Sequence, residues 1–404
     1  MGPSTLTLPR GTLATDKLKL AVGVVVGLFM LVPVAIAIHA GVYDSVVDNA
    51  LSGWGMWGTF AIYASTRPSR KEITLTVSIA LMLRLAYNLA IGEHGYPGSK
   101  IIGMGVFLGL ASLTILIGRS VGSNREQSLA RRRALAVTAL LSYIGVCLTF
   151  YISFAKMVLP IKLDYFLYSF DTSLGMQLSF AAANLTHAFP VLFWIEAMVY
   201  NSLGFWFSLV YAVHAIYDLK SRISILTLFI ANAFIGFSLY FLFPAMGPKY
   251  AFPSFPVLPG QIHPVVALLN GTPNAMPSLH FGGTLLICWL SQPWKWFYRI
   301  TIALSALTAL ATLGLGEHYF IDLVVAVPYA LAIFALSAKT SGRKVPLAAG
   351  SAMVMLWLCF LRTGFFYPIL SWALVLATLV ISFKLKGRLA ARVWTPESSK
   401  VAQP

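Results

Sequence analysis

Apolar residues follow one another along this chain in long runs that are separated by short polar segments. A helix that crosses a bilayer needs about 20 mostly apolar residues. The pattern predicts about 12 such helices, at roughly 19–41, 50–65, 72–92, 101–119, 135–156, 188–212, 223–243, 277–294, 298–316, 319–338, 346–361 and 365–384. The predicted fold class is therefore an all-α integral membrane protein.

The order of these runs suggests three regions. Residues 1–134 form a membrane region of four spans, residues 135–340 a core of six spans, and residues 341–404 two further spans with a basic tail. The first run is longer than the core of a cleaved signal peptide, so we expect an uncleaved anchor. Ala35-Ile36-Ala37 leaves cleavage open.

Composition excludes two other classes of protein. Apolar residues make up 58% of the chain and charged residues only 10%, whereas a soluble domain carries about 25% charged residues. A single soluble core cannot bury so much apolar surface. A disordered chain is excluded as well, because disordered segments contain few apolar residues. The sequence therefore predicts a chain whose main partner is the membrane.

The net charge of +16 suggests nucleic acid in a soluble protein, but the positions of the charges change that interpretation. Of the 29 basic residues, 23 fall in loops on one side of the predicted membrane and five on the other, and Arg84 lies within a span. Cytoplasmic loops collect Lys and Arg. Both termini are therefore predicted to be cytoplasmic. The loops 157–187, 244–276 and 317–318 are predicted to face the periplasm, the extracellular side or an organelle lumen. Nucleic acid is not an expected partner.

Two polar segments fall at outward ends of the predicted spans. The first contains Pro277, Ser278 and His280 and opens the span 277–294. Proline suits the first turn of a helix, and the free N–H groups of that turn favour an anion such as phosphate. A hydroxyl and an imidazole would stand beside that anion.

The second segment contains His318 and Asp322, four residues apart at the start of the span 319–338. On a helix they share a face, so the carboxylate can bond one ring nitrogen and direct the other outward. The preceding loop 243–250 supplies Lys249 and Tyr250. We expect these two side chains, with Ser278, to bind phosphate.

Two histidines, one of them oriented by a carboxylate, suit phosphoryl transfer. One imidazole attacks phosphorus, the other protonates the leaving oxygen, and backbone donors with Lys249 hold the remaining oxygens. No metal or other cofactor is required. Two alternatives stay open: interfacial histidines bonded to backbone carbonyls, and a metal site of His280, His318 and Asp322.

These segments, in this order, resemble the signatures of the type-2 phosphatidic acid phosphatase superfamily, P-S-G-H followed by H-x-x-x-D. Here they are Pro277-Ser278-Leu279-His280 and His318-Tyr319-Phe320-Ile321-Asp322. The P-S-L-H variant, Phe243-Pro244-Ala245 with Pro248-x-Tyr250, and Leu167-Tyr168-x-x-Asp171-x-x-Leu174 look more like the inositol phosphorylceramide synthase branch, with sphingomyelin synthases as cousins. The resemblance covers about residues 160–340 and implies a six-helix phosphatase-like core.

The resemblance implies that His318 is the nucleophile, Asp322 its orienting partner and His280 the general acid. This chain departs from the phosphatases where they place arginines: Lys249 is followed seven residues later by Pro256 with no Arg in the loop, and Thr312 stands six residues before His318. Fewer arginines hold a phosphate dianion less firmly. The departure favours transfer between lipids over hydrolysis of a simple monoester.

Asp164 and Asp171 are seven residues apart and would share one face of a helix at the membrane surface. They could bind a polyol head group or line a lid over the site. The alternative is a helix in the head-group layer with its acids in water.

The expected function is a metal-independent lipid phosphotransferase, similar to inositol phosphorylceramide synthases, that moves a phosphate-containing head group between lipids through a phospho-histidine. A lipid phosphate phosphatase of the phosphatidate or polyprenyl phosphate type is the first alternative. For either enzyme, the partners would be a lipid phosphate donor and a lipid or water acceptor. A transporter or flippase without chemistry is the rival from another class, and the intramembrane residues Arg84 and Glu196, a candidate ion pair, are the feature that favours it.

Overall fold

The computed structural model describes residues 50–91, 99–121, 154–216 and 223–394, together with the single residues Ala35 and His39. This part of the chain is mostly helical. The elements are α2 (Ala50–Ser65), α3 (Arg70–Ile91), α4 (Ser99–Val121), β1 (Ile161–Lys162), α6 (Asp164–Ser173), α7 (Leu178–Ala188), α8 (Pro190–Asn201), α9 (Leu203–Ile216), α10 (Ile225–Leu242), α11 (Pro248–Ala251), β2 (Ala267–Leu268), α12 (Leu279–Leu290), α13 (Lys295–Gly314), α14 (Phe320–Ser337), η1 (Ser341–Arg343), α15 (Lys344–Thr363) and α16 (Pro368–Trp394).

Among the described residues, six helices are long and apolar enough to cross a membrane, or seven if the bent pair α7 and α8 counts as one span. The six are α3, α10, α13, α14, α15 and α16, and the span of α15 also includes η1. The apolar helices α2, α4, α9 and α12 also lie where apolar runs predicted spans. The runs 19–41 and 135–156 lie wholly or largely outside the described residues, and the total of twelve spans stays a prediction.

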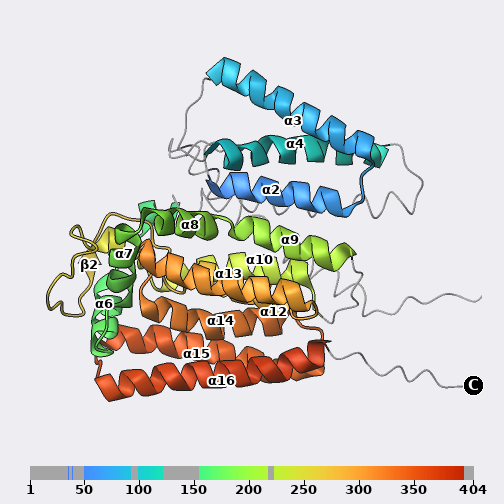
Figure 1. Ribbon diagram of the computed structural model, residues 1–404. Coiled ribbons are helices and arrows are strands. Elements are labelled where there is room, and N and C mark those ends of the chain that lie inside the picture. The colour runs from blue at the N-terminus through green and yellow to red at the C-terminus, as the bar shows by residue number, and fades with distance from the viewer. Residues whose placement is uncertain are drawn as a thin grey trace, which may run out of the picture.

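The helices form a layered bundle (Figure 1). Helices α2, α3 and α4 form a group in which α4 lies between α2 and α3, and this group rests through α2 on α9. Below it, α14 packs against α10, α12, α15 and α16, and it is the most deeply buried of the candidate spans. A helix that is apolar on every side is stable in such a central position.

One predicted span is divided. The run 188–212 becomes α8 and α9, which are separated at Ser202, and α8 turns back from α7 by 120° just before Pro190. Glu196 of α8 is almost fully buried and accepts a hydrogen bond from Thr186 of α7 at 2.9 Å between the two oxygens. Arg84 lies on α3, over the ring of Phe107.

The expected pairing of Arg84 with Glu196 is therefore not formed in the described structure. Helix α3 packs against α4, in the layer beyond α2, whereas Glu196 faces α7 and the end of α13. Hydropathy identifies which residues enter the membrane but not which layer a helix joins.

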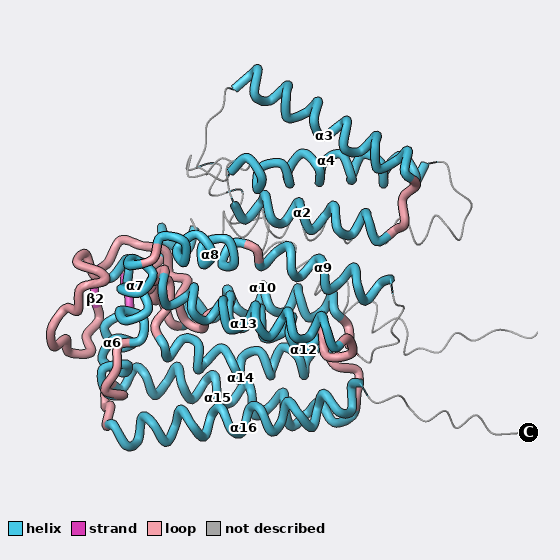
Figure 2. The backbone as a smooth tube through the Cα atoms, viewed as in Figure 1, coloured by secondary structure: helices cyan, strands magenta, loops and turns pink. Residues whose placement is uncertain are grey.

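The two ends of the bundle differ in charge. At the end where α12 and α14 begin, which we call the site end, the described acids are Asp164, Asp171, Glu317 and Asp322. At the opposite end, which we call the basic end, lie Lys295, Arg299, Lys339, Arg343, Lys344, Lys384, Lys386, Arg388 and Arg392. The loops of the site end gather beside α6, α7 and the β1–β2 pair (Figure 2), so irregular backbone covers that end of the helices.

Candidate active site

The loop before α14 carries His318 into the protein. His318 N–H and Glu317 N–H both bond to the carbonyl oxygen of Thr312, 3.1 Å away in each case. The carbonyl of His318 in turn accepts from the hydroxyl of Ser179 on α7 at 2.8 Å. These bonds fix the loop between α13 and α14, so the imidazole of His318 has one defined direction.

The His318 imidazole has a defined tautomer. Its Nδ1 lies 2.9 Å from the carbonyl oxygen of Ala275. A carbonyl oxygen only accepts hydrogen bonds, so Nδ1 carries the proton and Nε2 keeps its lone pair. Nε2 is buried and has no hydrogen-bond partner within the protein, and burial lowers the pKa of His318 to about 4. The ring is therefore neutral near pH 7, with a free nucleophilic nitrogen.

Asp322 contributes to the site in two ways. Its Oδ2 accepts from the N–H of Tyr319 at 2.8 Å, closing the first turn of α14. The same oxygen lies 3.5 Å from His318 Nδ1, farther than the carbonyl of Ala275. The nearest acceptor for His318 is thus a backbone group that side-chain spacing could not reveal, and Asp322 adds a carboxyl group beside it.

His280 lies in the first turn of α12, opposite His318. The centroids of the two rings are 6.3 Å apart. The His280 ring stacks on Tyr200 of α8, with centroids 3.7 Å apart and planes inclined by 18°. Sequence reasoning missed Tyr200, because it lies 80 positions from His280 and has no motif of its own.

Ser278 is the N-cap of α12. Its Oγ accepts from the N–H of Phe281 at 3.3 Å, and its own N–H bonds to the carbonyl oxygen of Asp322 at 3.2 Å. This second bond joins the starts of α12 and α14. The fold thereby brings the two histidine segments together at one place.

Asp164 and Asp171 lie on α6, and both are fully buried. Asp171 accepts from the N–H groups of Phe320 at 2.8 Å and Ile321 at 3.2 Å, the first two residues of α14. Burial raises the pKa of Asp171 well above its ordinary value. Its oxygens are occupied by the helix that follows His318, so Asp171 positions the segment that begins at Phe320.

Asp164 supports the neighbouring loop. It accepts from the N–H groups of Met246 and Gly247 and from the hydroxyl of Tyr319, at 3.0–3.2 Å. Burial raises the pKa of Asp164 to about 7 despite these donors. Both acids share a face of α6, as their spacing predicts, but that face is turned into the protein and not into water.

Lys249 and Tyr250 lie on the short helix α11 and are exposed. The hydroxyl of Tyr250 donates to Glu317 Oε1 at 2.9 Å. The Lys249 ammonium lies 5.5 Å from the centre of the Tyr250 ring and interacts electrostatically with Glu317. The two predicted phosphate ligands therefore surround a carboxyl group that directly precedes His318, and burial raises the pKa of that carboxyl.

No three His, Cys, Asp or Glu side chains within the described ranges are grouped as a metal site requires. His280, His318 and Asp322 thus do not form the two-histidine, one-carboxylate arrangement considered from the sequence. The arrangement instead offers two neighbouring imidazoles, one with a free lone pair, beside the N-terminal turn of α12.

Comparison with known proteins gives one finding for this region. A model of the PAP2 superfamily matches residues 165–336, less than half of the chain. That span includes both histidine segments, α6 from its second residue and α14 almost to its end. Searches of curated proteins and of solved structures gave no match. The matched superfamily indicates a lipid phosphatase or phosphotransferase kind of function.

Proposed function

We propose that this protein is a membrane phosphotransferase that moves a phosphate-containing head group from one lipid to another through a phosphorylated His318. The observation that carries the proposal is the state of His318. Its Nδ1 is bonded to the Ala275 carbonyl, and its Nε2 is buried and without a partner beside His280. A neutral imidazole in this arrangement is a prepared nucleophile.

The reaction has two steps. In the first, His318 Nε2 forms a bond to phosphorus, the bond between phosphorus and the leaving lipid oxygen breaks, and protonated His280 gives its proton to that oxygen. In the second, neutral His280 takes the proton from the acceptor hydroxyl, whose oxygen bonds to phosphorus as the N–P bond breaks. The 6.3 Å between the ring centroids lets one phosphorus centre lie within reach of both imidazoles.

The charge of the site favours transfer over hydrolysis of a monoester. On the loop before α12 the site has one exposed basic residue, Lys249. The positive charge of Lys249 interacts with the carboxyl group of Glu317. A carboxylate next to the nucleophile repels a phosphate dianion more than a singly charged diester. The charge pattern thus supports a phosphodiester donor of the kind that inositol phosphorylceramide synthases use, and a lipid phosphate phosphatase remains the second candidate.

The segregation of charge supports a location for the chemistry. Basic residues mark the cytoplasmic side of membrane proteins, and the described basic residues concentrate at the end opposite the histidines. We therefore place the reaction at the periplasmic, extracellular or lumenal face. Labelling engineered cysteines near His280 in sealed vesicles would test this side of the proposal.

The test of the proposed function uses purified protein and donor lipids with a labelled head group, including phosphatidate and phosphoinositides. Label on a new lipid indicates transfer, and label in water indicates hydrolysis. We expect His318→Ala to abolish both. His263→Ala is the matched control, because His263 is exposed on the loop before α12. Undiminished turnover by His318→Ala would rule the proposal out.

The transporter hypothesis predicts a different result. It requires lipid movement that survives His318→Ala and depends on polar residues within the membrane. Its supporting feature is weakened because Glu196 is bonded to Thr186 and not to Arg84. A lipid-scrambling assay with the same two variants separates movement from chemistry.

A further inference from the structure

A second group of polar side chains converges at the basic end, far from His280 and His318. A cavity of about 510 Å³ lies between the turn after α12 and the last turns of α16. Its lining residues are Gln292, Pro293, Lys386, Gly387, Ala390, Ala391 and Trp394. Nothing in the proposed reaction uses this cavity.

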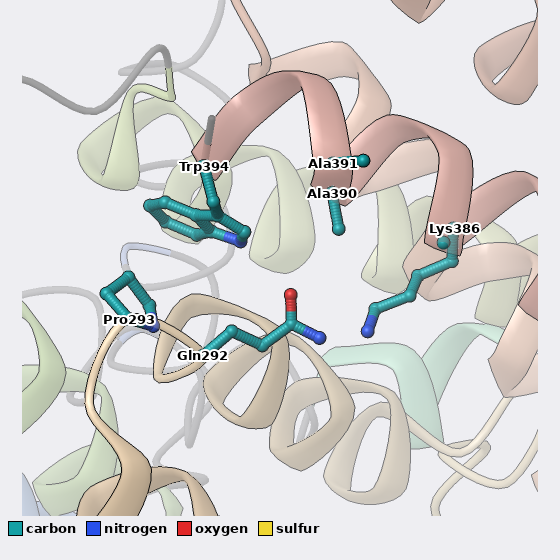
Figure 3. Close-up of a pocket in the computed structure, with 7 residues that line it drawn as sticks. Gln292, Pro293, Lys386, Ala390, Ala391 and Trp394 are labelled. Carbon is teal, nitrogen blue, oxygen red and sulfur yellow. The ribbon is translucent and has the colours of Figure 1, made fainter. Parts of the chain in front are cut away.

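Three nitrogen donors face this space. Figure 3 shows the Lys386 ammonium and the Gln292 amide turned toward each other, with the indole of Trp394 on the far side of the gap. The indole nitrogen of Trp394 is buried and lacks a hydrogen-bond partner within the protein. Because buried donors are nearly always paired in folded proteins, this N–H is available to an acceptor oxygen of a bound molecule.

The charge around the cavity selects the chemistry of that acceptor. The Lys386 ammonium lies 5.6 Å from the centre of the Trp289 ring, and this cation–π contact positions the ammonium at the edge of the cavity. Arg388 follows two residues later on α16, and Lys295 opens α13 beside Pro293. The acids of the described residues lie elsewhere: Glu72 on α3, Glu196 on α8 and the others at the site end. A group with several acceptor oxygens and negative charge fits these donors.

The helix surfaces next to the cavity indicate that this group belongs to a lipid. Phe383, one turn before Lys386, is 49% exposed, and Trp296, one turn after Pro293, is 76% exposed. Both lie on candidate membrane-spanning helices. Aromatic side chains at this level are typical of the boundary between acyl chains and head groups, so chains of a lipid held in the cavity would meet apolar surface.

We propose that this cavity binds the phosphate group of an anionic phospholipid in the membrane leaflet at the basic end. Lys386 supplies the charge, Trp394 and Gln292 supply N–H donors, and the exposed faces of α13 and α16 receive the acyl chains. The site is separate from the proposed reaction, because α12 carries His280 in its first turn and reaches the cavity only beyond its last residue.

The test measures lipid binding to the full-length protein in detergent by native mass spectrometry. Phosphatidylglycerol and phosphatidylcholine with the same acyl chains compete, with inorganic phosphate added in a separate arm. We expect the protein to prefer phosphatidylglycerol, and Lys386→Gln to weaken its binding about fivefold, the effect of one basic residue near anionic lipid. Trp394→Phe should also weaken binding, since it keeps the ring and removes only the N–H.

Lys384→Gln is the matched control, because it removes the same charge from an exposed position two residues away. It should keep the preference for phosphatidylglycerol. An equal loss in Lys384→Gln and Lys386→Gln would show general surface attraction and overturn the proposal. So would the absence of any preference, unchanged binding in Trp394→Phe, or displacement of the lipid by millimolar inorganic phosphate, which would indicate a site for a free anion.

Discussion

Replacing Asp171 with asparagine separates the two roles that this acid could have. In the structure its two oxygens accept the N–H groups of Phe320 and Ile321. Asparagine keeps one acceptor oxygen and turns an NH₂ group toward the other N–H. A buried N–H left without an acceptor costs about 1–3 kcal/mol. The start of α14, two residues after His318, should shift or loosen accordingly.

The kinetic effect follows from the position of His318. A displacement of the order of 1 Å at a reacting group can cost about 100-fold in rate. We expect Asp171→Asn to lower kcat by about 10- to 100-fold with KM changed by less than about twofold, since the substrate contacts remain. The midpoint of thermal unfolding in detergent should fall as well.

The assay is steady-state transfer of a labelled head group, with Ser173→Ala as control. Ser173 lies on the same helix, and its hydroxyl bonds to Ser371 of α16, so this variant disturbs α6 without touching α14. A rise in KM at constant kcat in Asp171→Asn would refute the reasoning. It would show instead that Asp171 contacts the head group, as the sequence alone suggested.

Three further results are expected. With a p-nitrophenol leaving group, which needs no proton from His280, the acid limb of kcat/KM should lie near pH 4, because burial lowers the pKa of His318 to about 4 and the nucleophile is neutral above that value; a limb at pH 6.5 or above would contradict it. Tyr200→Phe should keep the ring stack and near-normal turnover, whereas Tyr200→Leu should lose about tenfold, except with a p-nitrophenol leaving group that needs no proton. Gly247→Ala should lower activity, because φ is +92° and a Cβ would collide with the Glu317 carbonyl; Gly260→Ala, which meets open space, is its control.

Hydropathy predicted most of the described helices closely. The run 50–65 coincides with α2, and the run 319–338 differs from α14 by one residue at each end. The same pattern missed the break at Ser202, because the residues on both sides are equally apolar. It also assigned 157–187 to a loop, so it predicted neither α7 nor its 120° turn into α8. Apolar periodicity reports burial in membrane or protein but not where the chain reverses.

The site was only partly visible in the sequence. The spacing of His318 and Asp322 predicted that they lie close together, and their 3.5 Å separation agrees. The shorter contact, to the carbonyl of Ala275, involves a backbone atom 43 positions away and has no sequence signature. Asp171 bonds to α14 across 149 positions, so its burial could not be inferred from the helix it belongs to.

The central claim is a covalent bond between phosphorus and Nε2 of His318. The most direct measurement is mass spectrometry of the His280→Ala protein after reaction with a lipid analogue whose leaving group is p-nitrophenol. This leaving group bypasses the proton from His280, while the missing base slows the second step, so phosphorylated His318 should accumulate. Product formation without a phosphate adduct on His318, or with the adduct on another residue, would contradict the account.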